Sequence, residues 1–287
     1  MLLTRHAATL SIALAFGCAV PTSAQTASPA SEQVVQTFPL FSSNNRTIVV
    51  ARFNGSTPVP LVFDTGTNGN IVDSTYAKQV GLPNVGPSES VDGATGRPIP
   101  GYTTRLVGLT IGRIAVADGP ATVIDFKTRD SVGVIGPNSF PGRLTEIDFA
   151  HGRVRILPDT AGNRPTGSAV GHLDELPAVT VQLPGQTITA LVDTGNDQPL
   201  SLPLSMAASL PLKAPPVRNG TTRSAGGRQD SYVAQIVGEV RIGSVVLQSP
   251  MVSFEENGHP NVGMPVLKHM LIVVDHTGQR TWLSPLQ

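Results

Sequence analysis

Two aspartates occupy nearly identical settings in this 287-residue sequence. An apolar run leads directly into Asp64 in Leu61–Gly66 (LVFDTG) and into Asp193 in Ala190–Gly195 (ALVDTG), so each carboxylate ends what reads as a buried strand. Two carboxylates held side by side can share one proton, because both cannot readily ionise in contact. Such a pair can act as acid and base together and activate a water for attack on a carbonyl, which requires no metal and no other cofactor.

The residues that follow each aspartate are suited to a meeting of two loops. Gly66 and Gly195 permit a tight turn and the close approach of another backbone, while Thr65 and Thr194 offer hydroxyls that can bond to the facing loop. An isolated Asp-Thr-Gly could equally be a turn in which the aspartate caps its own loop. The second copy favours the paired arrangement, and retaining glycosidases, which also use two carboxylates, place them in distinct rather than repeated settings.

The repeat extends beyond these motifs. The segment Val134–Gly136 recurs as Asn261–Gly263. The closing segment Glu146–Leu157 recurs as Val273–Leu283, and both closing segments have the pattern of a strand, a turn and a strand. The features recur in the same order at a nearly constant offset, which indicates an internal duplication.

The duplication predicts two lobes. The first runs over residues 33–158 and the second over residues 171–287, joined by a polar, Gly- and Pro-containing linker at residues 159–170. The 29 glycines and 25 prolines, with short β-branched apolar runs between them, favour an all-β protein. Helical signals are brief, chiefly Ser74–Val80 and Leu202–Ser209.

The N-terminus resembles an export signal. A charged start is followed by the apolar run Leu10–Val20 and by small residues ending at Ala24, so residues 1–24 are expected to be a signal peptide of a periplasmic or secreted protein. The apolar run is too short to span a bilayer. The single cysteine, Cys18, lies in this segment; lipid attachment at Cys18 is an alternative, and the rest of the chain has no thiol for a disulfide or a metal.

Charge and motifs narrow the function classes. Lys and Arg together number 20, as do Asp and Glu, and no basic cluster is present, which argues against a nucleic-acid partner. There is no His-Glu-x-x-His, no Gly-x-Ser-x-Gly and no phosphate-binding loop, so metalloenzyme, serine-hydrolase and nucleotide-binding interpretations lose their usual support.

These motifs resemble those of the aspartic peptidases over nearly the whole chain after the signal segment. The chain resembles a single-chain, two-lobed, retroviral-type (retropepsin-like or pepsin-like) aspartyl protease of bacterial type, with lobes nearer in length to those of retroviral-type peptidases than to those of pepsin. The resemblance implies an acid-protease fold, with two β-barrel-like lobes related by a pseudo-twofold axis and an active-site cleft between them. It also implies that Asp64 and Asp193 are catalytic, and that a short helical turn follows each apolar-apolar-Gly element.

The resemblance further implies roles for neighbouring residues. Thr65 and Thr194 would lock the two loops together, and Gly66 and Gly195 would be close-approach positions. Glycine-rich flaps would lie at residues 91–96 and 223–227, although two ordinary hairpin turns remain an alternative. Residues expected to touch substrate are Thr67, Asn196, Gly93, Ala94, Thr95, Ala225 and Gly226. The Thr67 hydroxyl is also expected to hydrogen-bond Asp64.

The sequence therefore predicts an exported aspartic endopeptidase that hydrolyses peptide bonds as a monomer, since both half-sites are in one chain. The alternative is a peptide-binding or regulatory protein with the same fold and little turnover. It is motivated by two departures from the family pattern, Asn196 directly after the second Asp-Thr-Gly and Asn261 in place of an apolar residue.

Overall fold

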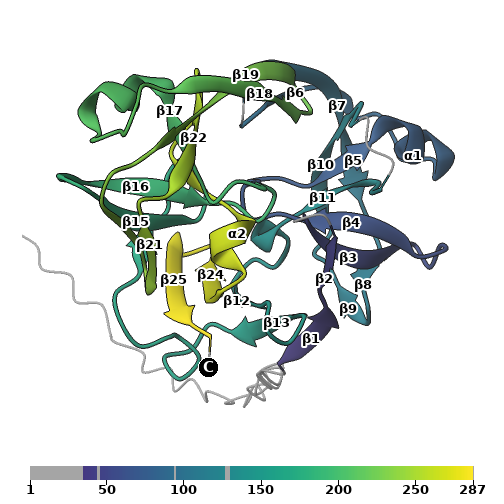
Figure 1. The fold of residues 1–287 in the computed structure, drawn as a ribbon. Coiled ribbons are helices and arrows are strands. Elements are labelled where there is room, and N and C mark those ends of the chain that lie inside the picture. Colours follow the sequence, from purple (N-terminus) through teal and green to yellow (C-terminus); the bar gives the residue numbers. More distant parts are fainter. Residues whose placement is uncertain (1–34, 44–45, 94, 127–129, 287) are drawn as a thin grey trace, which may run out of the picture. The chain divides into compact units, whose positions relative to one another are not determined.

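The computed structural model describes residues 35–43, 46–93, 95–126 and 130–286, and its regular elements are nearly all β-strands (Figure 1). The predicted signal segment 1–24, with Cys18, and the flap residue Ala94 lie outside the described residues. By its contacts the chain divides into residues 1–33 and a second unit, residues 34–287, which contains all of the described helices and strands.

The first half of this unit forms a ten-stranded sheet. Its order is β6-β7-β10-β5-β11-β4-β3-β8-β9, with β2 paired to β3. The strands are β2 (Phe41–Ser43), β3 (Arg46–Phe53), β4 (Val59–Phe63), β5 (Ile71–Asp73), β6 (Gly86–Val91), β7 (Pro98–Leu106), β8 (Leu109–Ile111), β9 (Ile114–Ala115), β10 (Gly119–Ile124) and β11 (Gly133–Ile135). Alternate residues of β3 face the core, whereas the last three residues of β4 are all buried.

The second half repeats the order of this sheet, without a counterpart of β2. Its nine strands run in the order β18-β19-β22-β17-β23-β16-β15-β20-β21, which reproduces the path of the first sheet. The strands are β15 (Ala178–Leu183), β16 (Gln186–Val192), β17 (Leu200–Pro203), β18 (Val217–Ser224), β19 (Gly227–Gln235), β20 (Glu239–Ile242), β21 (Val245–Gln248), β22 (Met251–Glu255) and β23 (Asn261–Val262). The predicted all-β, two-lobed, duplicated architecture is confirmed.

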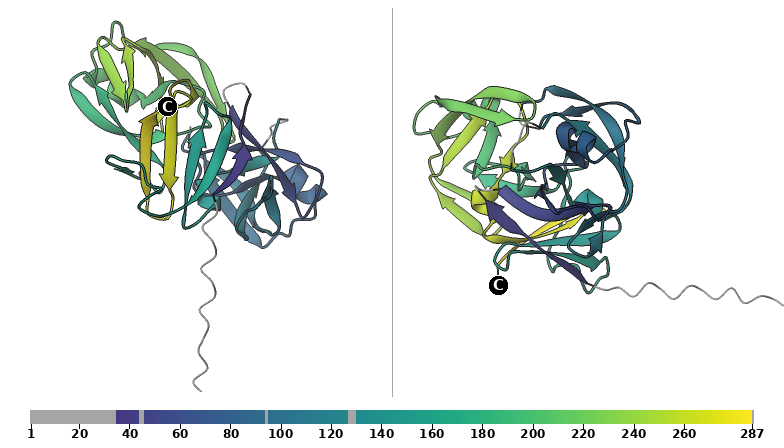
Figure 2. Two further views of the ribbon diagram at one scale, coloured as in Figure 1. Left: turned by 90° about the horizontal axis from the view of Figure 1, so that it is seen from below. Right: turned by 90° about the vertical axis from the view of Figure 1, so that its right-hand side faces the viewer.

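A six-stranded sheet joins the two halves, with the order β1-β13-β12-β24-β25-β14. Its strands are β1 (Gln36–Pro39), β12 (Arg143–Asp148), β13 (Arg153–Pro158), β14 (Val170–Gly171), β24 (Met270–Asp275) and β25 (Arg280–Pro285). The two predicted closing hairpins, β12-β13 and β24-β25, lie next to each other through antiparallel pairing of β12 with β24. Figures 1 and 2 show these strands gathered on one side of the unit.

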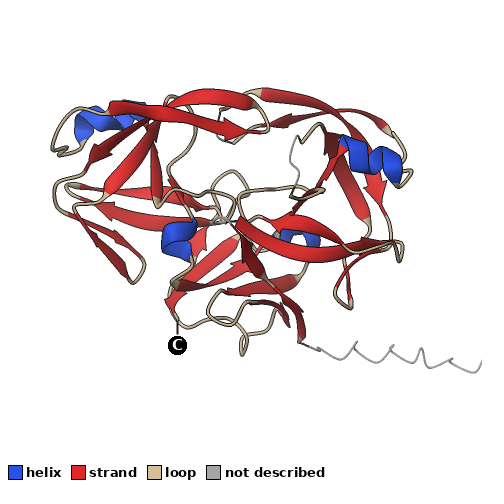
Figure 3. Ribbon diagram, turned by 45° about the vertical axis from the view of Figure 1, so that its right-hand side comes forward, coloured by secondary structure: helices blue, strands red, loops and turns tan. Residues whose placement is uncertain are grey.

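Helices are short, as Figure 3 shows in blue. They are α1 (Ser74–Gln79), the 3-10 turns η1 (Pro137–Ser139) and η2 (Leu204–Ser209), and α2 (Met264–Leu267). Helix α1 begins where the Asp73 carboxylate accepts hydrogen bonds from the backbone amides of Thr75 and Tyr76. The turns η1 and α2 follow Gly136 and Gly263, which matches the helical turns expected after the two apolar-apolar-Gly elements.

The joining sheet has its own small apolar cluster. Leu144, Leu157, Val273 and Trp282 are buried together on one of its faces, and the Arg280 guanidinium lies 5.5 Å from the centre of the Trp282 ring. Because β12 and β13 come from the first half and β24 and β25 from the second, this cluster packs the halves against each other. Among the described residues, no helix has the length and apolar character needed to cross a membrane.

Trp282→Ala is expected to lower the free energy of unfolding by about 3 kcal/mol, because it leaves a cavity in the cluster that packs the two halves together. Urea unfolding followed by far-ultraviolet circular dichroism measures the change, since Trp282 is the single tryptophan and its fluorescence is lost in the variant. Val246→Ala, at a side chain 37% exposed on β21, is the control. Equal stability of the two variants would contradict the assigned role of the cluster.

Candidate active site

Strands β4 and β16 carry the two aspartates to equivalent places. Strand β4 pairs in parallel with β11, and β16 pairs in parallel with β23. The pairings continue one residue further, because the Asp64 amide donates to the Ile135 carbonyl at 2.9 Å and the Asp193 amide donates to the Val262 carbonyl at 3.0 Å. Each aspartate is therefore fixed at the point where its strand becomes a loop.

The two loops are bonded to each other through their threonines. Thr65 Oγ1 donates to the Val192 carbonyl at 2.5 Å and accepts from the Thr194 amide at 3.0 Å. Thr194 Oγ1 donates to the Phe63 carbonyl at 2.9 Å and accepts from the Thr65 amide at 3.1 Å. Both threonines are fully buried, so these bonds have no competition from water and fix the spacing of the loops.

The glycines after the threonines leave the space into which the opposite carboxylates fit. A Cβ at Gly66 would lie 2.6 Å from Cγ of Asp193, and a Cβ at Gly195 would lie 2.7 Å from Oδ2 of Asp64. Any larger residue would push the carboxylate away from its partner. The glycine amides also bind their own aspartates, with Gly66 N and Gly195 N each donating to Oδ1 of Asp64 and Asp193, respectively, at 2.7 Å.

This geometry places the Asp64 and Asp193 carboxyls in hydrogen-bonding contact. Removal of Asp64 from water raises its pKa well above the ordinary carboxyl value, and the charge of Asp193 raises it further. The Gly66 and Gly195 amides oppose that rise by stabilising the carboxylate. Some surface of each side chain remains accessible, but protein atoms surround Asp64 closely enough for desolvation to dominate. The pair can thus hold a single proton in a range where free carboxyls have ionised.

The residues after the two motifs differ in what they do. Thr67 Oγ1 donates its single proton to the Gly69 carbonyl at 2.7 Å and therefore does not donate to Asp64. The prediction of a hydrogen bond from Thr67 to Asp64 is wrong. Asn196 instead joins a side-chain network, because its Nδ2 lies 3.0 Å from Oδ1 of Asn261. Asn261 Nδ2 in turn donates to Oδ2 of Asp193 at 2.7 Å.

The segments predicted as flaps are the turns of two long hairpins, β6-β7 and β18-β19. The turns lie side by side at the top of Figure 1 and again in Figure 3. Gly93 is exposed, Thr95 is buried, and Ala225 and Gly226 are partly buried. Thr95 and Gly226 are thus brought together in a contact between the hairpins rather than left open.

Asp92 makes that contact, and the sequence had not singled it out. Its buried carboxylate accepts from the amide and hydroxyl of Thr95 at 2.8 and 2.7 Å in its own turn. From the opposite hairpin it accepts from the Ser224 hydroxyl and the Gly226 amide, both at 2.8 Å. Burial by itself raises the pKa of Asp92, but these hydrogen bonds outweigh it and hold the pKa below the ordinary value. The available sequence signal was an Asp three residues before a Thr, a local capping pattern that does not reveal a partner in the other lobe.

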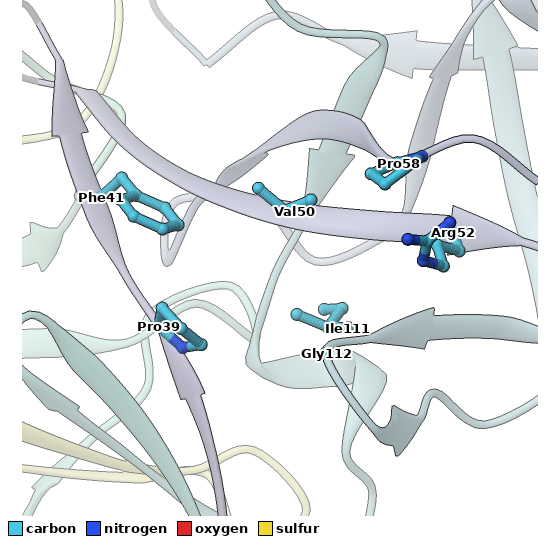
Figure 4. Close-up of a pocket in the computed structure, with 7 residues that line it drawn as sticks. All are labelled: Pro39, Phe41, Val50, Arg52, Pro58, Ile111 and Gly112. Carbon is cyan, nitrogen blue, oxygen red and sulfur yellow. The ribbon is translucent and has the colours of Figure 1, made fainter.

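A separate hollow lies on the outer face of the first sheet. It has a volume of about 330 Å³ and is lined by Pro39, Phe41, Val50, Arg52, Pro58, Ile111 and Gly112 (Figure 4). These residues supply no carboxylate, histidine or nucleophile, so the hollow has no acid-base chemistry. Across the described residues, no group of three or more His, Cys, Asp or Glu side chains is placed to hold a metal ion.

Comparison with protein families gives one match that covers both halves. The family model described as "Aspartyl protease" matches residues 49–138 and residues 179–266, together more than half of the chain. Each matched segment contains one Asp-Thr-Gly loop and the apolar-apolar-Gly or Asn-apolar-Gly strand that pairs beside it. No curated protein matches the chain.

Thr194→Val is expected to lower the free energy of unfolding by about 1 to 3 kcal/mol, because the buried Thr65 amide loses its acceptor. The Phe63 carbonyl keeps a second donor in the Thr47 hydroxyl, so it is not left unpaired. Urea unfolding measures the loss. Thr194→Ser retains the hydroxyl and serves as the control, and a valine variant as stable as the serine variant would contradict the proposed bonding.

The contact between the hairpins is expected to weaken in acid. A carboxyl whose pKa is lowered by folding stabilises the native contact above its ordinary pKa, and this stabilisation is lost as the pH falls through the lowered value. Amide hydrogen exchange should therefore show protection of Thr95 and Gly226 at neutral pH and loss of that protection in acid. Asp92→Asn should show weakened protection already at neutral pH.

Asp118→Asn is the matched control, because the Asp118 carboxylate accepts from the Gly108 amide within the first lobe. It should leave the protection of Thr95 and Gly226 unchanged. Unaltered protection in Asp92→Asn at every pH would show that the carboxylate does not hold the hairpins together.

Proposed function

The chain belongs to the aspartyl protease family, and from this we propose that it is an endopeptidase in which Asp64 and Asp193 hydrolyse peptide bonds with one water molecule. The observation that carries the proposal is the contact of the two carboxyls across duplicated loops, with the pKa of Asp64 raised well above its ordinary value by burial and by the charge of Asp193. Perturbed carboxyl pairs of this kind are typical of catalytic acid and base groups.

The proposed reaction needs one ionised and one protonated carboxyl. The ionised member takes a proton from the water as its oxygen attacks the peptide carbonyl carbon, and the protonated member gives its proton to the carbonyl oxygen. Collapse of the resulting gem-diol breaks the C–N bond. The carboxyl that took the water proton passes it to the leaving amine, and a hydroxyl of the gem-diol returns a proton to the other aspartate, which restores the starting state.

Several finer features belong to the same proposal. Both carboxyls come from one chain, which supports activity as a monomer. The paired hairpins β6-β7 and β18-β19 are suited to cover an extended peptide, with backbone groups available for strand-like pairing. We also propose that the enzyme is exported, on the signal-like segment at residues 1–24, and that it is of the single-chain retroviral type.

Cleavage of a peptide library between about pH 3 and pH 7 tests the proposal. Wild type should cleave internal peptide bonds with a bell-shaped pH dependence. Activity should fall in acid, where both carboxyls are protonated, and should fall in base, where both are ionised. Because the pKa of Asp64 is raised, the loss of activity in base should occur at a pH above the pKa of an ordinary carboxyl. Asp64→Asn and Asp193→Asn should each reduce kcat by about 1000-fold or more, since neither can share a proton in the same way.

Circular dichroism should show that both variants are folded, because asparagine removes a charge from a site where two carboxylates repel each other. Full activity in either variant would refute the shared-pair mechanism. A folded wild type that binds peptides without cleaving them would refute the peptidase assignment and support the alternative of a peptide-binding protein.

A further inference from the structure

The two carboxyls of the pair have different side-chain neighbours, although their backbone settings are equivalent. In the second half, Asn261 lies on β23 opposite Leu191 of β16, and its Nδ2 donates to Oδ2 of Asp193 at 2.7 Å. In the first half, the equivalent strand β11 places Val134 opposite Val62 of β4. A valine side chain has no donor, so this bond has no counterpart at Asp64.

The direction of the Asn261 bond is fixed by the backbone. The Gln198 amide lies 2.9 Å from the Asn196 side chain, and because an amide N–H only donates, the atom that it meets must be the acceptor Oδ1. The Nδ2 of Asn196 then faces Asn261 at 3.0 Å and requires Oδ1 there. Asn261 must consequently turn its Nδ2 toward Asp193, which settles the orientation of both side-chain amides.

The hydrogen bond from Asn261 favours one protonation state of its acceptor. A carboxylate oxygen accepts an N–H more strongly than a carboxylic acid does, so a donor fixed in this direction stabilises ionised Asp193. Other charges do not compensate. The titratable group that faces Asp193 is Asp64, while Asp197, on the same loop, is exposed and bonds to the side chain of Gln198.

We propose that Asn261, oriented by Asn196, is a positioning residue that makes Asp193 the ionised member of the pair and leaves the shared proton on Asp64. This rests on the proposed peptidase function and deepens it, because it assigns the two roles in catalysis. Asp193 is the base that takes the proton from water, and Asp64 is the acid that protonates the peptide carbonyl oxygen.

The same residues explain why the motif departs from the family pattern in the second half only. Asn196 and Asn261 are not independent changes, because the first fixes the orientation of the second. Without Asn196, the Asn261 side chain would lose the partner that fixes its direction. Together they form a chain of bonds from the Gln198 backbone to the Asp193 carboxylate.

Carbon-13 labelling of the aspartate carboxyl carbons allows each member of the pair to be titrated by NMR, with Asp64→Asn and Asp193→Asn used to assign the signals. In wild type we expect the Asp193 signal to respond first as the pH rises and the Asp64 signal to respond later. Wild type in which Asp64 ionises first would overturn the proposal, and this result does not depend on turnover.

Asn261→Val gives the second half the residue that the first half has at Val134. Loss of the donor should bring the two titrations closer together and move the acid limb of the kcat/KM profile to higher pH by about one to two units. The exchanged variant Val134→Asn with Asn261→Val should move Asp64 toward earlier ionisation. Asn163→Val, whose amide bonds the Pro158 carbonyl away from the pair, controls for loss of an asparagine.

The outcomes separate this inference from the proposed function. An active Asn261→Val enzyme with the titration order and acid limb of wild type would overturn the role of Asn261 and leave the peptidase assignment intact. A wild type that cleaves no peptide would refute the peptidase assignment, and the order of the NMR titrations would still decide which aspartate is ionised.

Discussion

The contact of two carboxyl groups is the interaction around which this structure is organised. Left to themselves, two such groups repel once ionised, and burial makes each charge costly. The chain holds them together by reciprocal bonds between Thr65 and Thr194 and the facing strands, which are fully buried and therefore rigid. The sheets behind the loops supply the stable support that this unfavourable contact requires.

The duplicated sheets bring the two carboxyls together, and side-chain differences between the two halves give the carboxyls different surroundings. Repetition of one strand order in the two large sheets brings identical backbone loops to a common axis, so the glycine and threonine positions correspond in full. A symmetric pair would have no physical reason to place its proton on either aspartate. The Asn196-Asn261 network exists in one half only, and it therefore breaks the symmetry at the side chains while the backbone keeps it.

The sequence predicted what depends on repetition and on local pattern. The two-lobed all-β fold, the closing hairpins and the short helical turns could all be anticipated, because strand periodicity and the repeated motifs specify them directly. The division into residues 33–158 and 171–287 remains a prediction about the chain, and the structure adds that strands from both halves share the six-stranded sheet.

Contacts between distant side chains could not be predicted in the same way. Asn261 stood out only as a polar residue at an apolar position, since its partners Asp193 and Asn196 lie 68 and 65 residues away. Asp92 was hidden for the same reason, because its partners Ser224 and Gly226 are 132 and 134 residues distant. The Thr67 hydroxyl was assigned to Asp64 by analogy, whereas the local turn to Gly69 captures it.

The two halves are joined at three levels, and these differ in how easily they can separate. The six-stranded sheet combines backbone pairing of β12 with β24 and a buried apolar cluster, and the threonine bonds lie at fully buried positions. The hairpin tips are held mainly by one carboxylate, Asp92, with its side-chain and amide donors. Since local opening follows the weakest contacts, a peptide that must reach Asp64 and Asp193 would enter by parting the hairpins, while the base of the molecule stays closed. In the proposed peptidase, the Asp92 contact would thus affect the entry of a peptide, whereas the carboxyl pair would carry out the chemistry.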